Sequence, residues 1–290
     1  MNKNLTFSFI GFGLIGGTIA KALRKLYPDS KIMAYNYRNT PHPSLEKAKQ
    51  DGNLSHISTT LSEAADADVI LLCAPVIKNV AYLEQIAPLI RKDTLVTDVG
   101  SVKGNIVKKA IELNIGGNFL GAHPMAGREK VGYENSDDKM LENATFIITP
   151  NEYNTEEQVE FLKDLFIKMK AKPLIMDPTV HDSVTAGISH GPHIVSASLV
   201  NTISNRDNPE DGLYLKLAAG GFKDITRISS SSPEMWRDIC LANKTETLNF
   251  IDEFTEILAQ VKASIESEDG DKIYEFFDTA RQYREGFNNV

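Results

Sequence analysis

The segment from Gly121 to Gly127, with the sequence GAHPMAG, places one histidine, His123, among small residues. A carbon that carries a hydroxyl group can release hydride only when another group takes the hydroxyl proton. A neutral imidazole performs this task well near pH 7, because its unperturbed pKa lies just below that value. His123 is therefore the leading candidate for a general base.

A glycine-rich turn near the start of the chain has the spacing of a dinucleotide-binding motif. It follows an apolar run and opens a helical run that reaches Leu26. In such motifs the first glycine permits a tight turn, the second lets the backbone approach a pyrophosphate, and the third lets the helix pack on the strand. The residues expected to border the cofactor are Gly11, Gly13, Leu14, Ile15 and Gly16. Together with His123, the motif predicts a dehydrogenase that uses NAD(P)+; a glycine-rich turn without a ligand is the alternative.

The residues after the second apolar run bear on the choice between NAD+ and NADP+. An acidic residue there, about twenty positions after the glycines, would bind the ribose 2′-hydroxyl. Asn36 occupies this position, so that a 2′-phosphate would meet no carboxylate. Arg38 is expected either to pair with that phosphate or stack on adenine, or to be a solvated loop cation. The sequence favours tolerance of NADP+ and leaves NAD+ open.

Two further strand ends are expected to border the cofactor, because ligands of open parallel sheets gather at the carboxyl ends of the strands. Ala74 and Pro75 follow one apolar run, and small residues there would let the cofactor lie against the strand. Ser101 follows the next run. It is expected either to cap the following helix or to form a hydrogen bond with a substrate.

The composition is that of an ordinary globular protein. The chain has 290 residues, of which 42% are hydrophobic and 24% charged, and its net charge is −8, from 31 basic and 39 acidic residues. Without a long basic run, nucleic acid is not expected as a partner. No apolar stretch reaches the roughly 18 residues that a membrane span needs, and no signal peptide is found, so a cytoplasmic protein is expected. Cys73 and Cys240 stand far apart and are expected to be buried thiols.

The first half of the chain alternates short apolar runs with helical patterns, which is typical of a parallel sheet covered by helices. The expected strands are Thr6–Ile10, Lys31–Tyr35, Val69–Ala74, Leu95–Asp98, Phe119–Gly121 and Thr145–Thr149, with an edge strand at Pro173–Met176. A helix is expected over Pro75–Ile90. From Thr179 onward only helical periodicity is found, so we expect a dinucleotide-binding domain over residues 1–177 and an all-helical domain over residues 178–290.

Three histidines of the second half, His181, His190 and His193, suggest a metal site. However, residues nine apart on one continuous helix point about 180° away from each other, and Pro192 is expected to distort such a helix. No cysteine or acidic cluster completes a ligand set. A polar pocket for a carboxylate-bearing substrate is therefore preferred, and no metal is expected.

Two more polar candidates follow in a segment rich in glycine and serine. Arg227 could capture a carboxylate with two parallel hydrogen bonds, and a salt bridge to a neighbour such as Asp224 is the alternative. Trp236, the one tryptophan of the chain, lies nine residues further on. Both are assigned to the expected substrate pocket.

Taken together, these motifs resemble the prephenate dehydrogenase family of tyrosine biosynthesis. The glycine motif is shared with many families, whereas His-Pro-(apolar)-Ala-Gly, Ser-His-x-Pro-His and Thr-Arg-Ile are specific in combination. The resemblance extends from about residue 5 to about residue 245. The matching stretches are Gly11–Gly16, Asp98–Lys103, Gly121–Gly127 with Glu129 and Lys130, His181–Asp182, Ser189–His193, Gly221–Ile228 and Met235–Asp238.

The resemblance implies an α/β Rossmann-type nucleotide-binding domain followed by an all-α C-terminal dimerisation domain, a 6-phosphogluconate-dehydrogenase-like arrangement with the active site between the domains. It implies a homodimer that converts prephenate to 4-hydroxyphenylpyruvate and CO2 with hydride transfer to NAD(P)+. By this likeness His123 is the catalytic histidine on the ring hydroxyl, and Ser101 lies near both His123 and the nicotinamide. Arg227 binds a substrate carboxylate, and His193 lies where a second substrate-facing polar group is expected. Independently of the likeness, we also assign His190 and Trp236 to substrate binding.

Two residues depart from the family pattern. Asn36 replaces an acidic residue common in NAD-using relatives, and Arg128 stands where a small polar residue is frequent, so that an extra cation is expected beside the cleft. Neither an appended regulatory domain nor a mutase domain is expected. Three alternatives remain: arogenate dehydrogenase; a reductase of 3-hydroxy acids or imines, which would need a lysine on a glycine-flanked helix; and a nucleotide-sensing protein without catalysis.

Overall fold

In the computed structural model the described residues are 5–128, 130–208, 210 and 212–287. The chain divides into two compact units, Met1–Lys244 and Thr245–Val290. The strands of the first unit are β1 (Thr6–Ile10), β2 (Lys31–Tyr35), β3 (His56–Ser58), β4 (Val69–Leu72), β5 (Leu95–Asp98), β6 (Gly121–Pro124), β7 (Thr145–Thr149) and β8 (Lys172–Ile175). The helices between them are α1 (Leu14–Leu26), α2 (Pro43–Gln50), α3 (Leu61–Ala65), α4 (Val76–Ile86), α5 (Gly104–Glu112), η1 (Tyr133–Asn135), η2 (Asp138–Leu141) and α6 (Glu156–Lys168).

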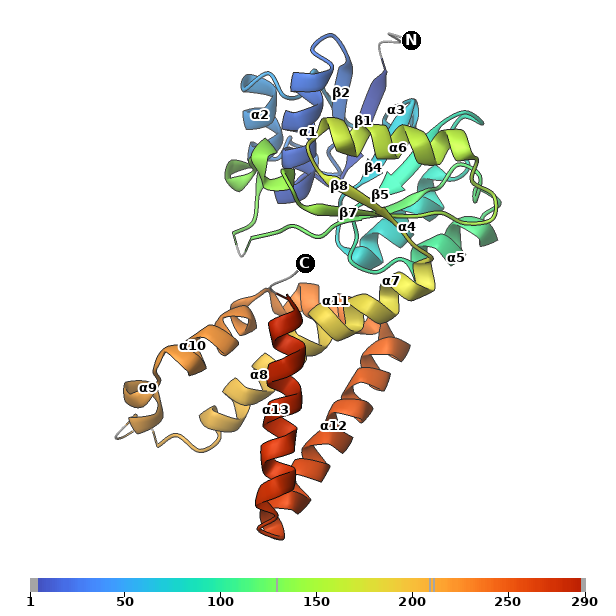
Figure 1. Cartoon of the computed structure of the whole chain (residues 1–290). Coiled ribbons are helices and arrows are strands. Elements are labelled where there is room, and N and C mark those ends of the chain that lie inside the picture. Colours follow the sequence, from blue (N-terminus) through green and yellow to red (C-terminus); the bar gives the residue numbers. More distant parts are fainter. Residues whose placement is uncertain (1–4, 129, 209, 211, 288–290) are drawn as a thin grey trace. The chain divides into compact units, whose positions relative to one another are not determined.

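Five strands form a parallel sheet in the order β3-β2-β1-β4-β5 (Figure 1). The chain leaves β1 toward β2 on one side and later returns to β4 on the other, so β1 is the point where the strand order reverses. Ile10 at the end of β1 lies beside Tyr35 of β2 and Leu72 of β4. Three strand ends therefore meet next to the glycine turn, where sheets of this kind bind ligands.

Apolar side chains bury both faces of this sheet, because alternate residues of a strand point to opposite sides. Phe9 packs into a cluster with Leu23 of α1 and Leu162 of α6. Its neighbour Ile10 packs into a second cluster with Leu83 of α4. Burial of one such side chain stabilises the fold by about 1.5–3 kcal/mol, and the two layers hold the strand ends in place.

A second sheet has the order β6-β7-β8, with β6 antiparallel to β7 and β8 parallel to β7. His123 lies inside β6 and is paired with Ile147. The expected strand at Phe119–Gly121 was wrong in its position: Phe119 forms only an isolated bridge with Val96, and the strand runs from Gly121 to Pro124. Pairing with β7 fixes this strand, and sequence periodicity carries no information about that partner.

From Pro178 on, every described element is a helix, as the periodicity predicted. The elements are α7 (Pro178–Thr185), a π-helical turn η3 (Ala186–His190), α8 (Gly191–Ser204), α9 (Leu213–Leu217), α10 (Gly220–Thr226), η4 (Arg227–Ser230), α11 (Pro233–Ala242), α12 (Lys244–Glu266) and α13 (Gly270–Gly286). The Asp177 carboxylate accepts the N–H groups of Thr179 and Val180 and thus begins α7. The ranges 1–177 and 178–290 stay a prediction, since the division into compact units falls later, at Lys244.

The expected elements compare closely with the observed ones. Four strands have the expected bounds, while Val69–Ala74 is two residues too long and Pro173–Met176 is shifted by one. The expected helix Pro75–Ile90 is shorter at both ends, as α4. No described helix has the length and apolarity needed to cross a membrane.

Candidate active site

The glycine turn after β1 is built by close approach to the end of β4. Gly11 has φ +88°, and a Cβ there would lie 2.4 Å from the Ala74 nitrogen and 2.6 Å from the Cys73 carbonyl carbon. A Cβ on Gly16 would lie 3.1 Å from the Gly11 oxygen, whereas Gly13 has no atom within 4 Å of that position. The first and third glycines are thus required by packing, and the second leaves its side of the turn open.

A cavity of about 660 Å³ adjoins this turn. Six of the residues predicted to border the cofactor line it: Gly11, Gly13, Asn36, Arg38, Ala74 and Pro75. The remaining motif residues, Leu14, Ile15 and Gly16, form the start of α1 directly after Gly13, and no side chain caps this helix. The N–H groups of its first turn are therefore free of a side-chain acceptor, as a pyrophosphate site requires.

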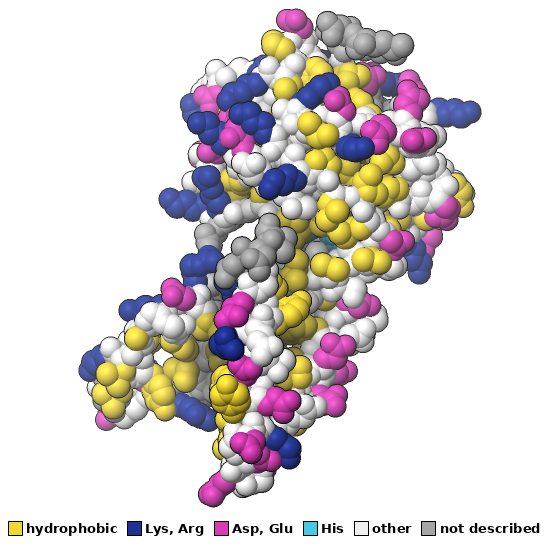
Figure 2. Space-filling model, viewed as in Figure 1, with side chains coloured by type: hydrophobic (Ala, Val, Ile, Leu, Met, Phe, Trp, Pro, Cys, Tyr) yellow, Lys and Arg dark blue, Asp and Glu magenta, His cyan; other side chains and the backbone are white. Residues whose placement is uncertain are grey.

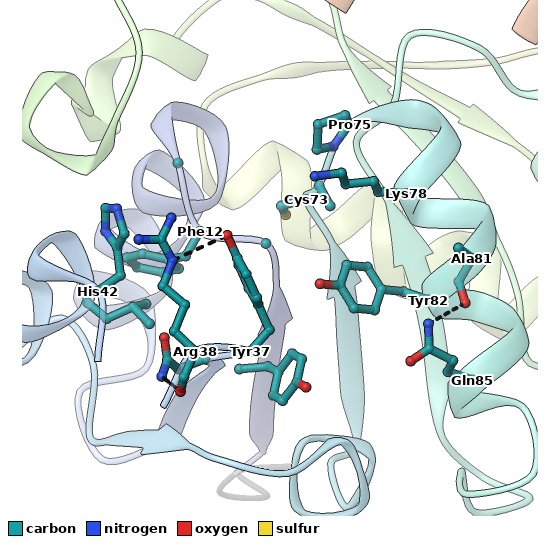
Figure 3. Close-up of a pocket in the computed structure, with 16 residues that line it drawn as sticks. Phe12, Tyr37, Arg38, His42, Cys73, Pro75, Lys78, Ala81, Tyr82 and Gln85 are labelled. Atoms are coloured by element: carbon teal, nitrogen blue, oxygen red, sulfur yellow. Dashed lines mark hydrogen bonds between the residues drawn. The ribbon is translucent and has the colours of Figure 1, made fainter. Parts of the chain in front are cut away.

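The cavity carries basic groups on opposite walls (Figure 3). Arg38 and His42 come from the segment between β2 and α2, and Lys78 comes from α4. None of the described residues that line this cavity is aspartate or glutamate. His42 and Lys78 were not identified from the sequence; the signal for Lys78 was its position on the first helical turn after Pro75.

Asn36 has a role that the sequence did not reveal. Its side chain is buried, and Nδ2 donates to the carbonyl oxygens of Arg38 at 2.7 Å and Thr40 at 3.2 Å. The Arg38 guanidinium lies over the Tyr37 ring, 5.3 Å from its centroid, and Nε donates to the Tyr37 hydroxyl at 3.2 Å. Asn36 therefore shapes the loop that presents Arg38 to the cavity.

His123 is the first member of a chain of hydrogen bonds that runs into the protein. Its Nδ1 lies 2.9 Å from Nε2 of His181, whose Nδ1 lies 2.8 Å from Oδ1 of Asp182. The Asp182 carboxylate also accepts the backbone N–H of Lys103 at 2.7 Å and of Gly104 at 2.8 Å, at the start of α5. His123 is partly exposed, while His181 is fully buried.

A buried ion pair holds β6 against the end of β5. Lys103 Nζ contacts the Asp98 carboxylate, and the two side chains are 0% and 1% exposed. Lys103 Nζ also donates to the Ala122 oxygen at 2.8 Å, and the Ala122 N–H donates to Asp98 at 3.3 Å. Ala122 precedes His123, so this pair fixes the backbone that carries the imidazole. Ser101 lies in the same connection and is partly exposed.

The surroundings of His123 keep it uncharged. Burial lowers the pKa of His123 well below its usual 6.5, and positive charge on His181, Lys103 or His190 acts in the same direction. A neutral imidazole has one nitrogen that accepts a proton. Because Nδ1 is engaged with His181, Nε2 is the nitrogen available to a substrate.

The substrate-side candidates gather around the π-helical turn. His193 stacks on Trp236 at a ring distance of 3.8 Å, and its Nδ1 lies 2.9 Å from the Ser189 oxygen. Among the described residues, His190 Nε2 and Trp236 Nε1 are buried without a hydrogen-bond partner. Burial lowers the pKa of His190 to about 4, so that its ring is neutral. Two buried polar nitrogens without protein partners indicate a site for a polar ligand.

No continuous α-helix carries the histidines. His181 lies on α7 and His190 ends the π-helical turn η3, while Pro192 is the second residue of α8. Asn243 links His190 to Asp182, because its Nδ2 donates to the Asp182 carbonyl at 2.8 Å and lies 3.2 Å from His190 Nδ1. In the described part of the chain, no group of three His, Cys, Asp or Glu side chains could hold a metal ion.

Arg227 begins η4 and is exposed; its charge contributes to the lowered pKa of His193, which places the two side chains near each other.

Arg128 lies 3.7 Å from Asp137, so the extra cation expected beside the cleft has a carboxylate nearby. Glu129, which belongs to the stretch that resembles the family, lies outside the described residues. Cys73 and Cys240 are free thiols, half-buried rather than in the core; burial is the main cause that raises the pKa of each.

A doubly wound nucleotide-binding sheet, followed by helices and with a neutral histidine on the adjoining sheet, defines a nicotinamide-dependent oxidoreductase of two parts. The chain belongs to the prephenate dehydrogenase family: residues 19–175 match the family's nucleotide-binding domain and residues 177–279 match its dimerization domain. The prephenate dehydrogenase of Bacillus subtilis is 38% identical over 97% of this chain and 76% of its own length.

Solved structures agree with this assignment. Prephenate dehydrogenase from A. aeolicus, in complex with hydroxyphenyl propionate and NAD+, is 32% identical with a TM-score of 0.90, over 98% of this chain and 99% of that one. Synechocystis arogenate dehydrogenase is 27% identical with a TM-score of 0.84, over 98% of this chain and 100% of that one. Both match over nearly the whole chain, so the likeness includes the helical part.

Proposed function

We propose that the protein is a prephenate dehydrogenase that converts prephenate and NAD(P)+ to 4-hydroxyphenylpyruvate, CO2 and NAD(P)H. The observation that carries the proposal is the state of His123. The imidazole is neutral, and its Nε2 is left to accept a proton because Nδ1 contacts His181. The backbone just before it is held by Lys103, the cation of the buried ion pair. Family membership supports the substrate, because relatives of more than 30% identity are prephenate dehydrogenases.

His123 accepts the proton of the ring hydroxyl at Nε2 while the carbon that bears this hydroxyl loses hydride. The nicotinamide, when bound, accepts the hydride. The ring carboxylate then leaves as CO2, because its bonding electron pair completes an aromatic ring. The proton on His123 returns to the phenolate oxygen, so the histidine is regenerated without net proton release.

The second carboxylate and the keto group of prephenate need polar partners. His190 Nε2 and Trp236 Nε1 supply two buried nitrogens that have no partner in the described protein. His193 of α8 stacks on Trp236 of α11, and the charge of Arg227, at the start of η4, acts on His193. We assign substrate binding to these four residues, with Arg227 as the carboxylate ligand, because orientation of the dianion lowers the barrier of the reaction. Ser101 stays a predicted neighbour of His123.

The test is an absorbance assay of nicotinamide reduction that crosses prephenate and arogenate with NAD+ and NADP+. Rapid reduction with prephenate is expected. His123→Asn should lower kcat by about 100-fold or more, in the range of lost acid–base catalysis, with a small change in KM. Arg227→Ala should mainly raise KM. Activity with arogenate alone would replace the substrate, and folded, cofactor-binding protein inactive in all four assays would favour the nucleotide sensor.

The finer proposal for the cofactor is that NADP+ is accepted at least as well as NAD+. A 2′-phosphate carries two negative charges, and the cavity beside the end of β2 offers Arg38, His42 and Lys78, while its lining in the described part of the chain includes no carboxylate. Arg38 is the assigned partner of the phosphate, because an arginine forms paired hydrogen bonds with it.

Arg38→Gln tests this assignment. The variant should raise the Kd for NADP+ by about 10-fold or more, from the loss of one charge-assisted contact, and leave the Kd for NAD+ nearly unchanged. Lys49→Gln is the matched control: Lys49 is exposed on α2, outside the cavity, and the same charge is removed. Equal effects of Arg38→Gln on both cofactors would contradict the assignment.

We also propose a homodimer formed through the helical part, which matches a dimerization domain. Apolar side chains are exposed on α9, among them Leu215 and Leu217, and independently on α13, among them Phe277 and Tyr283 (Figure 2). Exposed apolar surface of this kind marks an interface in a stable protein. Light scattering at micromolar concentration is expected to give the mass of a dimer. The cytoplasmic location stays a prediction.

A further inference from the structure

Two buried residues behind His123 remain without a part in the proposed function. Asp182 and His181 are 7% and 0% exposed, and burial of a carboxylate beside an imidazole is costly unless both are well paired. Here every polar atom of the two side chains is engaged: Asp182 with the N–H groups of Lys103 and Gly104 and with His181, and His181 with His123.

The hydrogen bonds of this chain determine where its protons lie. Asp182 accepts from backbone N–H groups, and therefore acts as a carboxylate, so His181 Nδ1 must carry the proton that it shares with Asp182. His181 Nε2 is then an acceptor when the ring is neutral. It takes the Nδ1–H of His123, which leaves His123 Nε2 without a proton. The opposite tautomer of His123 would have a proton on Nε2 and would be unable to act as a base.

We infer that Asp182 and His181 are positioning residues that hold His123 in the base-competent tautomer and share the proton it takes from the substrate. This inference rests on the proposed function, because it assigns the reacting proton to His123. When the substrate hydroxyl gives its proton to His123 Nε2, the Nδ1 proton moves to His181 Nε2, and the resulting imidazolium lies 2.8 Å from Asp182. The protons return along the same path when the phenolate forms, so that no proton is gained or lost.

The relay explains how His123 can act as a base although basic side chains lie near it. His123 is adjacent to Lys103, whose own charge is balanced by Asp98, and to His190. These groups oppose a positive charge on His123, whereas Asp182 is, among the described residues, the carboxylate that is hydrogen-bonded to its relay. A proton that occupies Nε2 of His123 before the substrate binds removes the base.

Asp182→Asn is the decisive variant. An asparagine accepts hydrogen bonds only at Oδ1, because its Nδ2 is a donor. If Nδ2 faces His181, it donates to His181 Nδ1, so that the tautomers of His181 and His123 both reverse. We expect kcat to fall by about 100-fold or more, as for a wrong-tautomer variant of a His-Asp pair, with KM for prephenate nearly unchanged. In the residual activity, the acidic limb of the kcat/KM profile should move to lower pH, because the pair has lost its anion.

Two variants of His181 separate positioning from packing. His181→Gln retains an acceptor near the Nε2 position, whereas His181→Phe fills the volume without one. The glutamine variant should retain at least about 10-fold more kcat than the phenylalanine variant, which corresponds to one hydrogen bond of about 1.4 kcal/mol. Thr185→Val is the control: its buried hydroxyl bonds only the carbonyls of His181 and Asp182, so that the variant should keep both kcat and the pH profile.

A readout without turnover distinguishes this inference from the proposed function. In the protein labelled with ¹⁵N-histidine, proton–nitrogen correlation spectra at pH 7 should show the proton of His123 on Nδ1 and, in Asp182→Asn, on Nε2. A wild-type protein with the proton on Nε2 would overturn the inference, as would an Asp182→Asn variant with wild-type kcat and pH profile. If the tautomers are as expected but prephenate is not oxidised, the proposed function fails and the positioning role stands.

Discussion

Substitution of Lys103, just before α5, should lower the free energy of unfolding more than substitution of a surface lysine on α5. In Lys103→Met the Asp98 carboxylate remains buried at 1% exposure without its cation. Breaking a buried pair in this way costs about 3–5 kcal/mol. Asp98 keeps the N–H of Gly100 at 2.9 Å and of Ala122 at 3.3 Å, so we expect about 3 kcal/mol, at the low end of that range.

For a unit of this size a loss of about 3 kcal/mol lowers Tm by roughly 6–12 °C. The assay is thermal unfolding with cofactor absent, together with kcat, which should also fall because the Ala122 contact that fixes β6 is lost. Lys109→Met is the matched control: Lys109 pairs with Glu84 and Glu112 at 3.1 Å each at the surface, where solvent screens ion pairs and their loss changes stability little. Equal Tm values for the two variants would refute the reasoning, and so would a double variant, Asp98→Asn with Lys103→Met, less stable than Lys103→Met alone.

Three further outcomes are expected. Gly11→Ala should weaken cofactor binding and lower Tm, because its Cβ would lie 2.4 Å from the Ala74 nitrogen at φ +88°; calorimetric titration with wild-type affinity would contradict this. Asn36→Asp should weaken the binding of both cofactors instead of selecting NAD+, since a carboxylate oxygen would replace the Nδ2 that donates 2.7 Å to the Arg38 oxygen. Stability should fall as the pH drops from 7 to 5, because the pKa of His190 is about 4 when folded and the usual value is 6.5. The unfolded chain then binds the proton first, at a cost of about 2 kcal/mol over this window, and urea unfolding of His190→Gln should show a smaller loss.

The sequence predicted the nucleotide-binding sheet well because its evidence is local. The strands at Thr6–Ile10, Lys31–Tyr35 and Leu95–Asp98 are apolar runs buried on both faces, and they stand between clear helices. β3, at His56–Ser58, has three residues, too few to show a period. α2 begins at Pro43 and is mostly polar, so that no apolar stripe distinguished it from a loop.

The sequence predicted residues that lie together, but not how they are connected. Six of the residues predicted to border the cofactor line one cavity, and His123 was selected from its segment alone. The link from His123 through His181 to Asp182 was missed, because it depends on contact between residues 58 positions apart. The π-helical turn η3, which ends at His190, was not predicted either, because no propensity scale signals such a turn. Asn36 illustrates a different limit. The sequence suggested a role for this residue in cofactor choice, but its side chain also forms hydrogen bonds with the backbone of its own loop.

The buried charges around β6 show why the residues before His123 are as constrained as the histidine itself. A Cβ on Gly121 would lie 2.4 Å from Thr149 Oγ1 and 3.4 Å from Lys103 Cδ, so a glycine is required for β6 to lie on both β7 and the lysine. This close packing of β6 on the lysine side chain also brings Lys103 Nζ within hydrogen-bond distance of the Ala122 oxygen. Because the same connection from Asp98 to Gly104 also delivers the N–H groups that bind Asp182, one short segment sets both the backbone position of His123 and the proton acceptor behind it. Displacement of that segment would therefore disturb both the position and the tautomer of His123. For this reason the His181 variants, and not the Lys103 variants, isolate the role of the proton relay.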